Sequence, residues 1–261
     1  MHDVTALTRQ QLDVANAASV AEAVSQFRPD LVINCSANNQ VDASEDDPVP
    51  ALAVNAWGPR LLARAAADAG ALFVHYSTDF VFDGHTARPY AETDAPRPRS
   101  VYSASKLLGE WFAAEAPRHY VLRVESLFGG AKAKSSLDLL LNAIAGGQPA
   151  RAFSDRVVSP SYVEDVAAAT LALVTSHTAF GLYHCVNTGA ATWLEVAQEL
   201  ARAVGRPDSP ILAVSVDDVT FRAVRPKYAA LDNAKLRAAG VDMPTWQDAV
   251  ARYVSTKAIH M

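Results

Sequence analysis

Short apolar runs alternate with helical patterns through most of the chain, and this alternation limits the folds that it can adopt. The runs 31–33 and 72–74 are continuously apolar, as expected for strands buried on both faces of a sheet. The expected strands are 4–7, 31–34, 72–76, 120–124, 182–186 and 211–214, and the expected helices are 19–27, 48–69, 102–116, 137–145, 163–174 and 192–204. This order predicts an α/β fold with a Rossmann-like, doubly wound parallel sheet.

The alternation loosens after Gly129, and prolines break the last third of the chain into short pieces. We therefore expect a Rossmann domain over 1–128, to which 156–186 returns, and a small C-terminal lobe built from 129–155 and 187–261. This lobe is the expected place for a substrate.

Composition and charge exclude several classes of protein. The formal net charge is −5 and the Lys and Arg residues are scattered singly, so we expect no nucleic-acid partner. The apolar stretches are shorter than the ~20 residues that a membrane span requires, and the start has no signal-peptide pattern, so no membrane association is expected. Cys35 and Cys185 have no CxxC spacing and are expected to be reduced core residues of a cytoplasmic protein without a metal site.

The stretch from Ser77 to Glu110 carries most of the chemical information. Ser77 and Thr78 follow a buried strand, and ligands bind at the carboxyl ends of parallel strands. Tyr102 and Lys106 are four residues apart, so they share one face of a helix. A tyrosine has a pKa of about 10, and a lysine ammonium nearby lowers it, which would make Tyr102 a usable acid or base.

A hydroxyl residue after a strand, followed by YxxxK at the start of a helix, resembles the short-chain dehydrogenases. The segments Y76-S-T-D-F-V-F-D-G84, Y90-A-E92 and K106-x-x-G-E110 are similar to the dTDP-4-dehydrorhamnose reductase branch of the extended subfamily. The resemblance implies hydride transfer from NADPH or NADH to a nucleotide-linked 4-keto-6-deoxy sugar, with a homodimer as a possible assembly. It gives catalytic roles to Thr78, Tyr102 and Lys106, with Tyr102 as the general acid.

The same resemblance assigns the binding residues. Those expected to contact the cofactor are Arg9, Asp13, Val14, Cys35, Ser36, Ala37, Asn55, Ser77, Tyr102 and Lys106. Those expected to contact the substrate are Thr78, Glu125, Ser126, Arg156 and Arg225. Thr8 stands where an acidic residue would bind a ribose 2′-hydroxyl, and Arg9 follows it, which favours NADP(H) over NAD(H).

Two departures from the family pattern affect these expectations. No glycine-rich turn precedes the expected strand 4–7, so the Rossmann domain lacks its first βα unit and should bind the cofactor weakly. We expect either that an upstream segment has been omitted, or that the strand 4–7 moves towards the sheet centre or pairs with another chain. The second departure is Val124-Glu125-Ser126, where the family usually has Thr-Ser-Trp, which places the identity of the sugar in doubt.

Two other functions remain open at this point. A nucleotide-sugar epimerase or dehydratase would use the same Tyr and Lys, but a dehydratase would want an Asp-Glu pair where this chain has Asp79-Phe80. A regulatory subunit that binds NADP or a nucleotide without turnover would keep the fold. The intact Thr78, Tyr102 and Lys106 favour the reductase.

Overall fold

The computed structural model describes residues 3–130, 133–176 and 178–258, which fall into two compact units. The first unit comprises 1–77, 98–122 and 180–182, and the second comprises 78–97, 123–179 and 183–261. The two units divide the chain at other positions than the domain boundary expected at residue 128. That boundary between a Rossmann domain and a C-terminal lobe stays a prediction.

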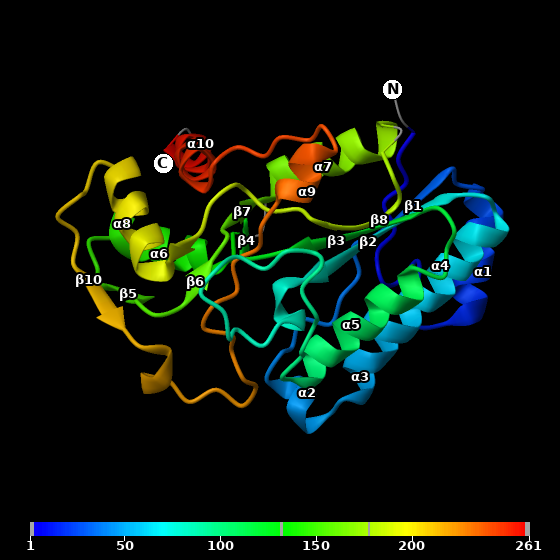
Figure 1. Cartoon of the computed structure of the whole chain (residues 1–261), viewed down its shortest axis with the longest axis horizontal. Helices are drawn as coiled ribbons and strands as arrows, with labels where there is room; N and C mark the ends of the chain where they lie inside the picture. Colours follow the sequence, from blue (N-terminus) through cyan, green and yellow to red (C-terminus); the bar gives the residue numbers. More distant parts are fainter. Residues whose placement is uncertain (1–2, 131–132, 177, 259–261) are drawn as a thin grey trace. The chain divides into compact units, whose positions relative to one another are not determined.

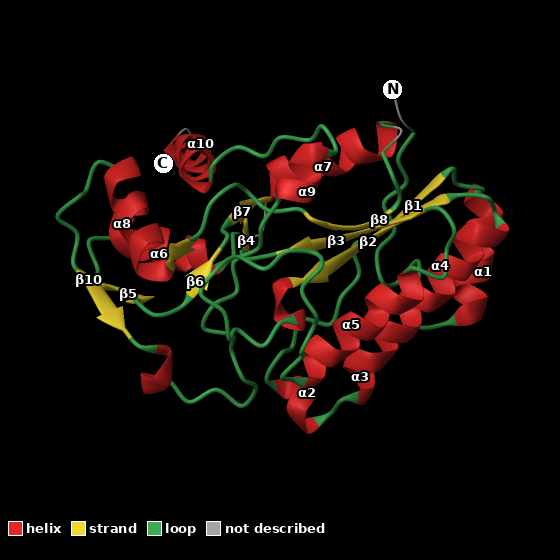
Figure 2. Ribbon diagram, in the orientation of Figure 1, coloured by secondary structure: helices red, strands yellow, loops and turns green. Residues whose placement is uncertain are grey.

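The main sheet has the parallel α/β arrangement that the alternation predicts. Its strands are β1 (Leu31–Asn34), β2 (Leu72–Thr78), β3 (His119–Val124) and β8 (Gly181–His184), in the order β1-β2-β3-β8 (Figure 2). β1 and β2 run parallel, with Leu31 opposite Leu72. The predicted Rossmann-like fold class is confirmed.

The first unit has six helical elements in its described part. They are α1 (Ala17–Phe27), α2 (Ala43–Asp46), α3 (Val49–Leu52), the π-helical turn η1 (Ala53–Trp57), α4 (Gly58–Asp68) and α5 (Val101–Ala113). Of these, α1, α4 and α5 contribute to one small apolar core. α4 lies between α1 and α5 (Figure 1), and its Leu62 and Ala66 are buried with Phe73 of β2. The helix expected over 48–69 is present without a break from 49 to 68, and η1 is a π-helical turn within it. Gly70 follows α4 with a φ of 69°, a left-handed conformation that commonly ends a helix and that glycine adopts without strain.

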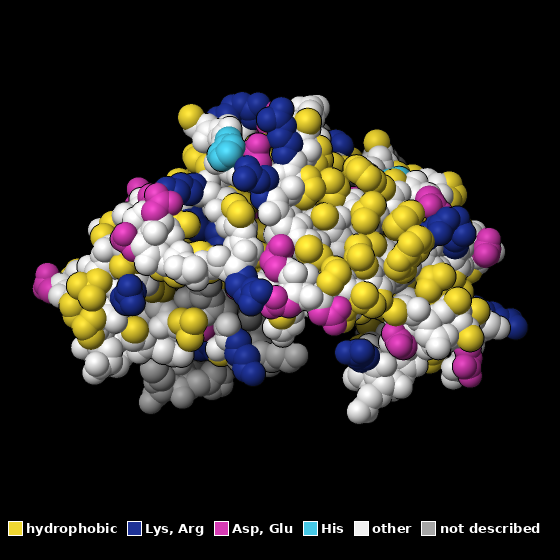
Figure 3. Space-filling view, turned by 90° about the horizontal axis from the view of Figure 1, so that it is seen from below, with side chains coloured by type: hydrophobic (Ala, Val, Ile, Leu, Met, Phe, Trp, Pro, Cys, Tyr) yellow, Lys and Arg dark blue, Asp and Glu magenta, His cyan; other side chains and the backbone are white. Residues whose placement is uncertain are grey.

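One surface of the first unit carries exposed aromatic side chains. Trp57 and Trp111 are at least half exposed. Figure 3 shows that hydrophobic side chains also gather on one part of the molecular surface. The Trp57 ring stacks on Phe112 with centroids 5.3 Å apart, and the Arg60 guanidinium lies over both rings. Stacking of this kind stabilises the side chains while leaving one face in water.

The expectation of a strand over 4–7 is wrong. These residues form no strand, and Val4 is 79% exposed. The physical reason is that apolar alternation stabilises a strand only when a neighbour accepts its backbone hydrogen bonds and covers one face. Within the described residues β1 pairs with β2 alone, and Ile33 on β1 is 45% exposed. Residues 4–7 therefore do not enter the centre of the main sheet, and they do not pair with its strands.

The second unit combines five helices with three short two-stranded sheets in its described part. The helices are α6 (Ser136–Ala145), α7 (Val163–Thr175), α8 (Trp193–Ala203), α9 (Ala234–Ala238) and α10 (Trp246–Ala258). The sheets pair β4 (Leu127–Phe128) with β7 (Ser161–Tyr162), β5 (Ala150–Phe153) with β10 (Ile211–Val214), and β6 (Val157–Val158) with β9 (Ala191–Thr192). Their apolar side chains form one core, and Thr192 and Glu195 form a capping box at the start of α8.

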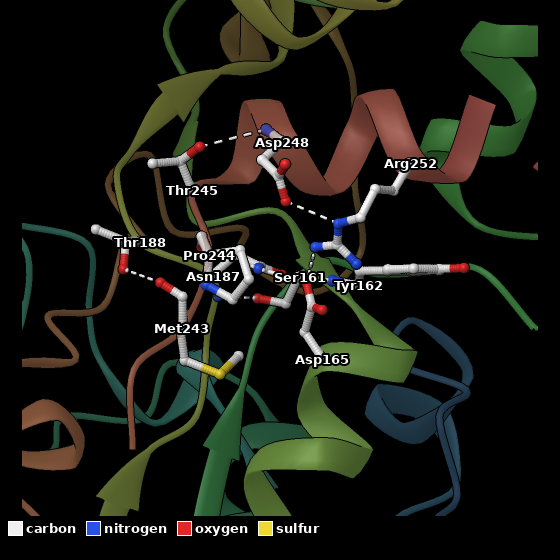
Figure 4. Close-up of polar contacts among 10 residues, drawn as sticks. All are labelled: Ser161, Tyr162, Asp165, Asn187, Thr188, Met243, Pro244, Thr245, Asp248 and Arg252. Atoms are coloured by element: carbon white, nitrogen blue, oxygen red, sulfur yellow. Dashed lines mark hydrogen bonds and ion pairs between the residues drawn. The ribbon is translucent and has the colours of Figure 1, made fainter. Parts of the chain in front are cut away.

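A buried polar network fixes α10 to the rest of the second unit (Figure 4). Asn187 accepts a hydrogen bond from the backbone of Tyr162 and donates to Asp165 and to the carbonyl of Pro244. Arg252 of α10 donates to the same Asp165 carboxylate at 2.6 Å. One amide and one carboxylate thus join three segments that are far apart in the sequence.

Candidate active site

The helix that carries Tyr102 and Lys106 begins at a well-defined point. Ser100 and Ser103 form a reciprocal cap, in which each side chain accepts a hydrogen bond from the other residue's backbone N–H. Such a cap satisfies two donors of the first turn and fixes the helix start. Tyr102 therefore lies in the first turn of α5, and Lys106 follows one turn later, as predicted.

Lys106 is almost completely buried, and its ammonium points at the strand that precedes Thr78. Its Nζ donates a hydrogen bond of 2.6 Å to the carbonyl of Tyr76 in β2. Burial removes water from the ammonium and lowers the pKa of Lys106 to about 8, while the charge of Glu110 acts in the opposite direction. Lys106 therefore changes between its charged and neutral forms close to neutral pH.

The loop after β1 reaches Tyr102. The Tyr102 hydroxyl lies 3.5 Å from Oδ1 of Asn39. Asn55 fixes this loop, because its amide exchanges two hydrogen bonds with the backbone of Asn38 and donates a third to Ser105 of α5. Asn55 is fully buried, so the structure assigns it the task of holding the loop against α5.

Of the remaining residues expected at the cofactor, Ser77 lies on β2, where it donates a hydrogen bond to Glu110, and the others lie on two further segments of the first unit. Ser36 donates through its backbone and its hydroxyl to Asn34 of β1, while Cys35 and Ala37 are exposed in the same loop. The expectation of a buried Cys35 is therefore wrong, because it stands just beyond the end of β1; Cys185 is buried, and both are free thiols.

The second segment contains Arg9, Asp13 and Val14. Arg9 is exposed in a turn, and Asp13 accepts a hydrogen bond from the backbone of Ala15. Val14 packs on Gly58 at the start of α4, where an added Cβ would lie 3.0 Å from the valine side chain.

Thr78 is the last residue of β2 and belongs to the second unit. Its hydroxyl donates to Asp79 Oδ1 at 2.9 Å and accepts from the backbone N–H of Phe80. Asp79 is fully buried, and its other oxygen, Oδ2, has no hydrogen-bond partner in the described part of the chain. An unpartnered oxygen at such a site is costly unless a ligand or a proton compensates for it.

Asp79, Glu125 and Arg156 form a buried charged cluster. Loss of solvent raises the pKa of Asp79 to about 7, although the charge of Arg156 opposes this rise. Burial, and then the charge of Asp79, raises the pKa of Glu125 well above its usual range, and burial lowers the pKa of Arg156. A single guanidinium, that of Arg156, thus faces two carboxyl groups. Because one positive charge balances only one carboxylate, the Asp79–Glu125 pair tends to keep one proton.

This cluster borders a cavity of about 240 Å³ in the second unit. The lining residues are Asp79, Phe80, Ser126, Leu127, Ser136, Arg156 and Trp193. Arg156 and Arg225 both place their guanidinium groups over the Phe80 ring, at 5.6 and 5.9 Å from its centroid. Four residues expected at the substrate, Glu125, Ser126, Arg156 and Arg225, thus gather at or beside the cavity.

Sequence reasoning missed Asp79 and Trp193 as residues of this cavity. The signal for Asp79 was its place directly after Thr78, at the carboxyl end of a strand. Trp193 gave no comparable signal, because its place at the start of α8, after the capping threonine, is also normal for a core residue.

Other parts of the Ser77–Glu110 stretch have structural roles. The Phe82 and Tyr90 rings stack with centroids 4.0 Å apart, and the Tyr90 hydroxyl donates to Asp83. Gly84 has a φ of 80°, and a Cβ there would lie 2.8 Å from Cα of Pro226. This part of the motif therefore anchors the segment that follows Arg225.

Within the described residues, no group of three or more His, Cys, Asp or Glu side chains is arranged to hold a metal ion. No helix in the described ranges is long and apolar enough to cross a membrane.

Comparison with known proteins gives consistent matches over the whole chain. The family model described as "RmlD substrate binding domain" matches residues 1–259. The dTDP-4-dehydrorhamnose reductase of Streptomyces griseus is 36% identical over 245 residues, which cover 92% of this chain and 80% of that protein. The spore coat polysaccharide biosynthesis protein SpsK of Bacillus subtilis is 30% identical, covering 98% of this chain and 90% of that protein.

A solved structure agrees with these matches. The dTDP-4-dehydrorhamnose reductase of Bacillus anthracis, crystallised in complex with NADP, superposes with a TM-score of 0.91 at 30% identity. The superposition covers 98% of this chain and 90% of that one.

Proposed function

Because the chain belongs to the family described as the RmlD substrate binding domain, within the extended short-chain dehydrogenases, we propose that it is an NADP(H)-dependent reductase of a nucleotide-linked 4-keto-6-deoxy sugar. The observation that carries the proposal is the placement of Tyr102 and Lys106 on one face of α5, with the buried ammonium beside the end of β2. A regulatory protein without turnover would not need a buried, partly desolvated lysine there.

The residues at this site fit a dinucleotide. An ammonium has three N–H donors, and the described part of the chain uses one of those of Lys106, on Tyr76. The others can bind ribose hydroxyls. Ser36 and the exposed Ala37 in the loop after β1 would line the same cofactor, and Asn55 would act on it by holding that loop.

The chemistry of the residues then follows from their charges. NADPH, when bound, supplies the hydride for the keto carbon. Tyr102 donates its phenolic proton to the carbonyl oxygen, and the charged ammonium of Lys106 stabilises the phenolate that remains. In the second unit, Thr78 is the residue whose hydroxyl would hydrogen-bond a substrate carbonyl, and to do so the hydroxyl would turn away from Asp79.

The cavity beside Asp79 is our proposed site for the sugar ring. Trp193 and Phe80 offer apolar faces, and the Asp79 Oδ2 and Arg156 Nε atoms, both buried without partners among the described residues, offer hydrogen bonds to hydroxyl groups. Arg156 faces two carboxyl groups, so its charge is already countered and it is a poor ligand for a diphosphate. We assign the diphosphate to Arg225.

Three finer points belong to the same proposal. Arg9, with Thr8 before it, favours the 2′-phosphate of NADP over the hydroxyl of NAD. We place the enzyme in the cytoplasm and propose a homodimer, which sedimentation would detect as a particle of twice the chain mass.

A turnover assay tests the proposal. The protein is mixed with NADPH and dTDP-4-dehydrorhamnose, and loss of the nicotinamide absorbance is followed. We expect turnover with NADPH and at least ~100-fold lower kcat for Tyr102→Phe, the usual loss when a general acid is removed. Near-normal turnover of this variant would show that Tyr102 is not the acid.

A further inference from the structure

Three ionisable side chains lie on successive turns of α5. Tyr102, Lys106 and Glu110 are spaced four residues apart, and all three are less than 10% exposed. Residues at this spacing lie one above the other on a helix face. The phenol, the ammonium and a carboxylate therefore form one buried column.

The ammonium of Lys106 depends on its neighbours for its charge. It has lost its water, and its hydrogen-bond partner, the carbonyl of Tyr76, carries no net charge. His75 of β2 packs nearby and is neutral, because burial and then the charge of Lys106 lower its pKa well below the usual value. Glu110 is the group whose charge raises the pKa of Lys106. Without such a charge, desolvation favours the neutral amine.

Glu110 is itself held in place by the strand that leads to Thr78. The hydroxyl of Ser77 donates a hydrogen bond of 2.6 Å to Glu110 Oε1, and both residues are buried. Next to Glu110 the helix closely approaches η1, since a Cβ on Gly109 would lie 2.1 Å from the carbonyl oxygen of Asn55. The carboxylate thus has a fixed position relative to Lys106.

We propose that Glu110 is a positioning residue of the active site: fixed by Ser77, it keeps the Lys106 ammonium charged beside Tyr102 and so extends the Tyr–Lys pair to a triad. This inference rests on the proposed reductase function, in which Tyr102 must lose its proton during turnover. A neutral Lys106 would leave the phenolate unstabilised, and the acid would become weaker. Glu110 acts without touching the substrate.

The test is the pH dependence of Glu110→Gln, a variant that keeps the shape and the acceptor for Ser77. Removal of the negative charge should shift the alkaline limb of the kcat profile, where Lys106 loses its proton, to lower pH by about one unit. At pH values above this limb kcat should fall roughly tenfold, while KM for the sugar stays the same. Glu110→Asp should restore part of the shift.

A matched control lies just beyond the end of the same helix. Glu115 is partly exposed and pairs with Arg60 and Arg64, so Glu115→Gln should leave the profile unchanged. A Glu110→Gln variant whose kcat falls by the same factor at every pH would show that Glu110 has only a structural role, and this would overturn the proposal.

A second readout does not depend on turnover. Nuclear magnetic resonance of protein with labelled lysine side chains follows the titration of Lys106 directly. The Lys106 midpoint should be lower in Glu110→Gln than in the unaltered protein, and in Glu110→Asp it should lie between the two. An unchanged midpoint overturns the inference even if the protein reduces the sugar, whereas a lowered midpoint supports it even if that substrate is wrong. If Glu110→Gln does not fold, the same comparison is made with Glu110→Asp alone.

Discussion

The buried carboxyl of Asp79 should make the stability of the protein depend on pH, and Asp79→Asn should remove that dependence. The folded chain holds the pKa of Asp79 at about 7, against an ordinary value of 3.8, because the group has lost its solvent. Between these two pH values the folded protein keeps a proton that the unfolded chain has released. Stability from this group is therefore fully present below about pH 4 and is lost as the pH rises through about 7.

The size of the effect follows from the same values. One pKa unit corresponds to ~1.4 kcal/mol, so a rise from 3.8 to about 7 corresponds to roughly 4 kcal/mol over the whole range. Between about pH 5 and about pH 8 the free energy of unfolding should fall by roughly 3 kcal/mol on account of Asp79. For a chain of this size that is roughly 6 to 12 °C in Tm. In the Asp79→Asn variant the asparagine side chain has no carboxyl proton to lose. The Arg156 guanidinium still has the Glu125 carboxyl group as its charged partner.

Urea unfolding of both proteins across this pH range gives the comparison. The Asp79→Asn variant should be the more stable protein at about pH 8, and the difference should shrink towards about pH 5. Asp208→Asn, which alters an exposed carboxylate of the same unit, should follow the unaltered protein at every pH. Equal pH dependence in Asp79→Asn and in the unaltered protein would refute the reasoning, because it would mean that Asp79 is already ionised in the folded state.

Two further predictions concern binding and packing. Arg225→Ala should raise KM for the nucleotide sugar by at least tenfold, because a charge-assisted hydrogen bond contributes ~1.5–3 kcal/mol. Steady-state kinetics measure this change. An unchanged KM would show that Arg225 does not bind the diphosphate. Gly109→Ala should lower the free energy of unfolding in urea by ~1–3 kcal/mol, because its Cβ would lie 2.1 Å from the Asn55 carbonyl oxygen; a loss below ~0.5 kcal/mol would show that η1 moves away from α5 freely.

The sequence alone predicted those features of the fold and the site that depend on residues close together in the chain. The apolar runs predict the strands β1 and β2, and the spacing of Tyr102 and Lys106 predicts that they share one helix. The structure has both features as expected. Each is fixed within a few residues, where periodicity acts.

The features that the sequence did not predict have one physical cause in common, because each depends on residues that are distant in the sequence. The segment 4–7 has the alternation of a strand, but a strand also requires a neighbour to accept its hydrogen bonds. The helix expected over 48–69 is present, but no local signal predicts the π-helical turn η1 within it, which coincides with the close approach of Gly109 to Asn55. A pattern along one segment says nothing of the surface that packs against it.

The substitution at Val124-Glu125-Ser126 bears on which sugar the protein accepts. The family usually has a Trp where this chain has Ser126, yet Ser126 still lines the cavity and Trp193 of α8 lines it as well. An aromatic face therefore remains available from a different element. Glu125 adds a second buried carboxyl beside Asp79, and its Oε2 accepts a hydrogen bond from the backbone of Ser159. A cavity with an aromatic face in a new place and an added carboxyl should select a different pattern of sugar hydroxyls. We therefore expect the preferred substrate to be a keto sugar related to dehydrorhamnose that differs in its hydroxyl groups.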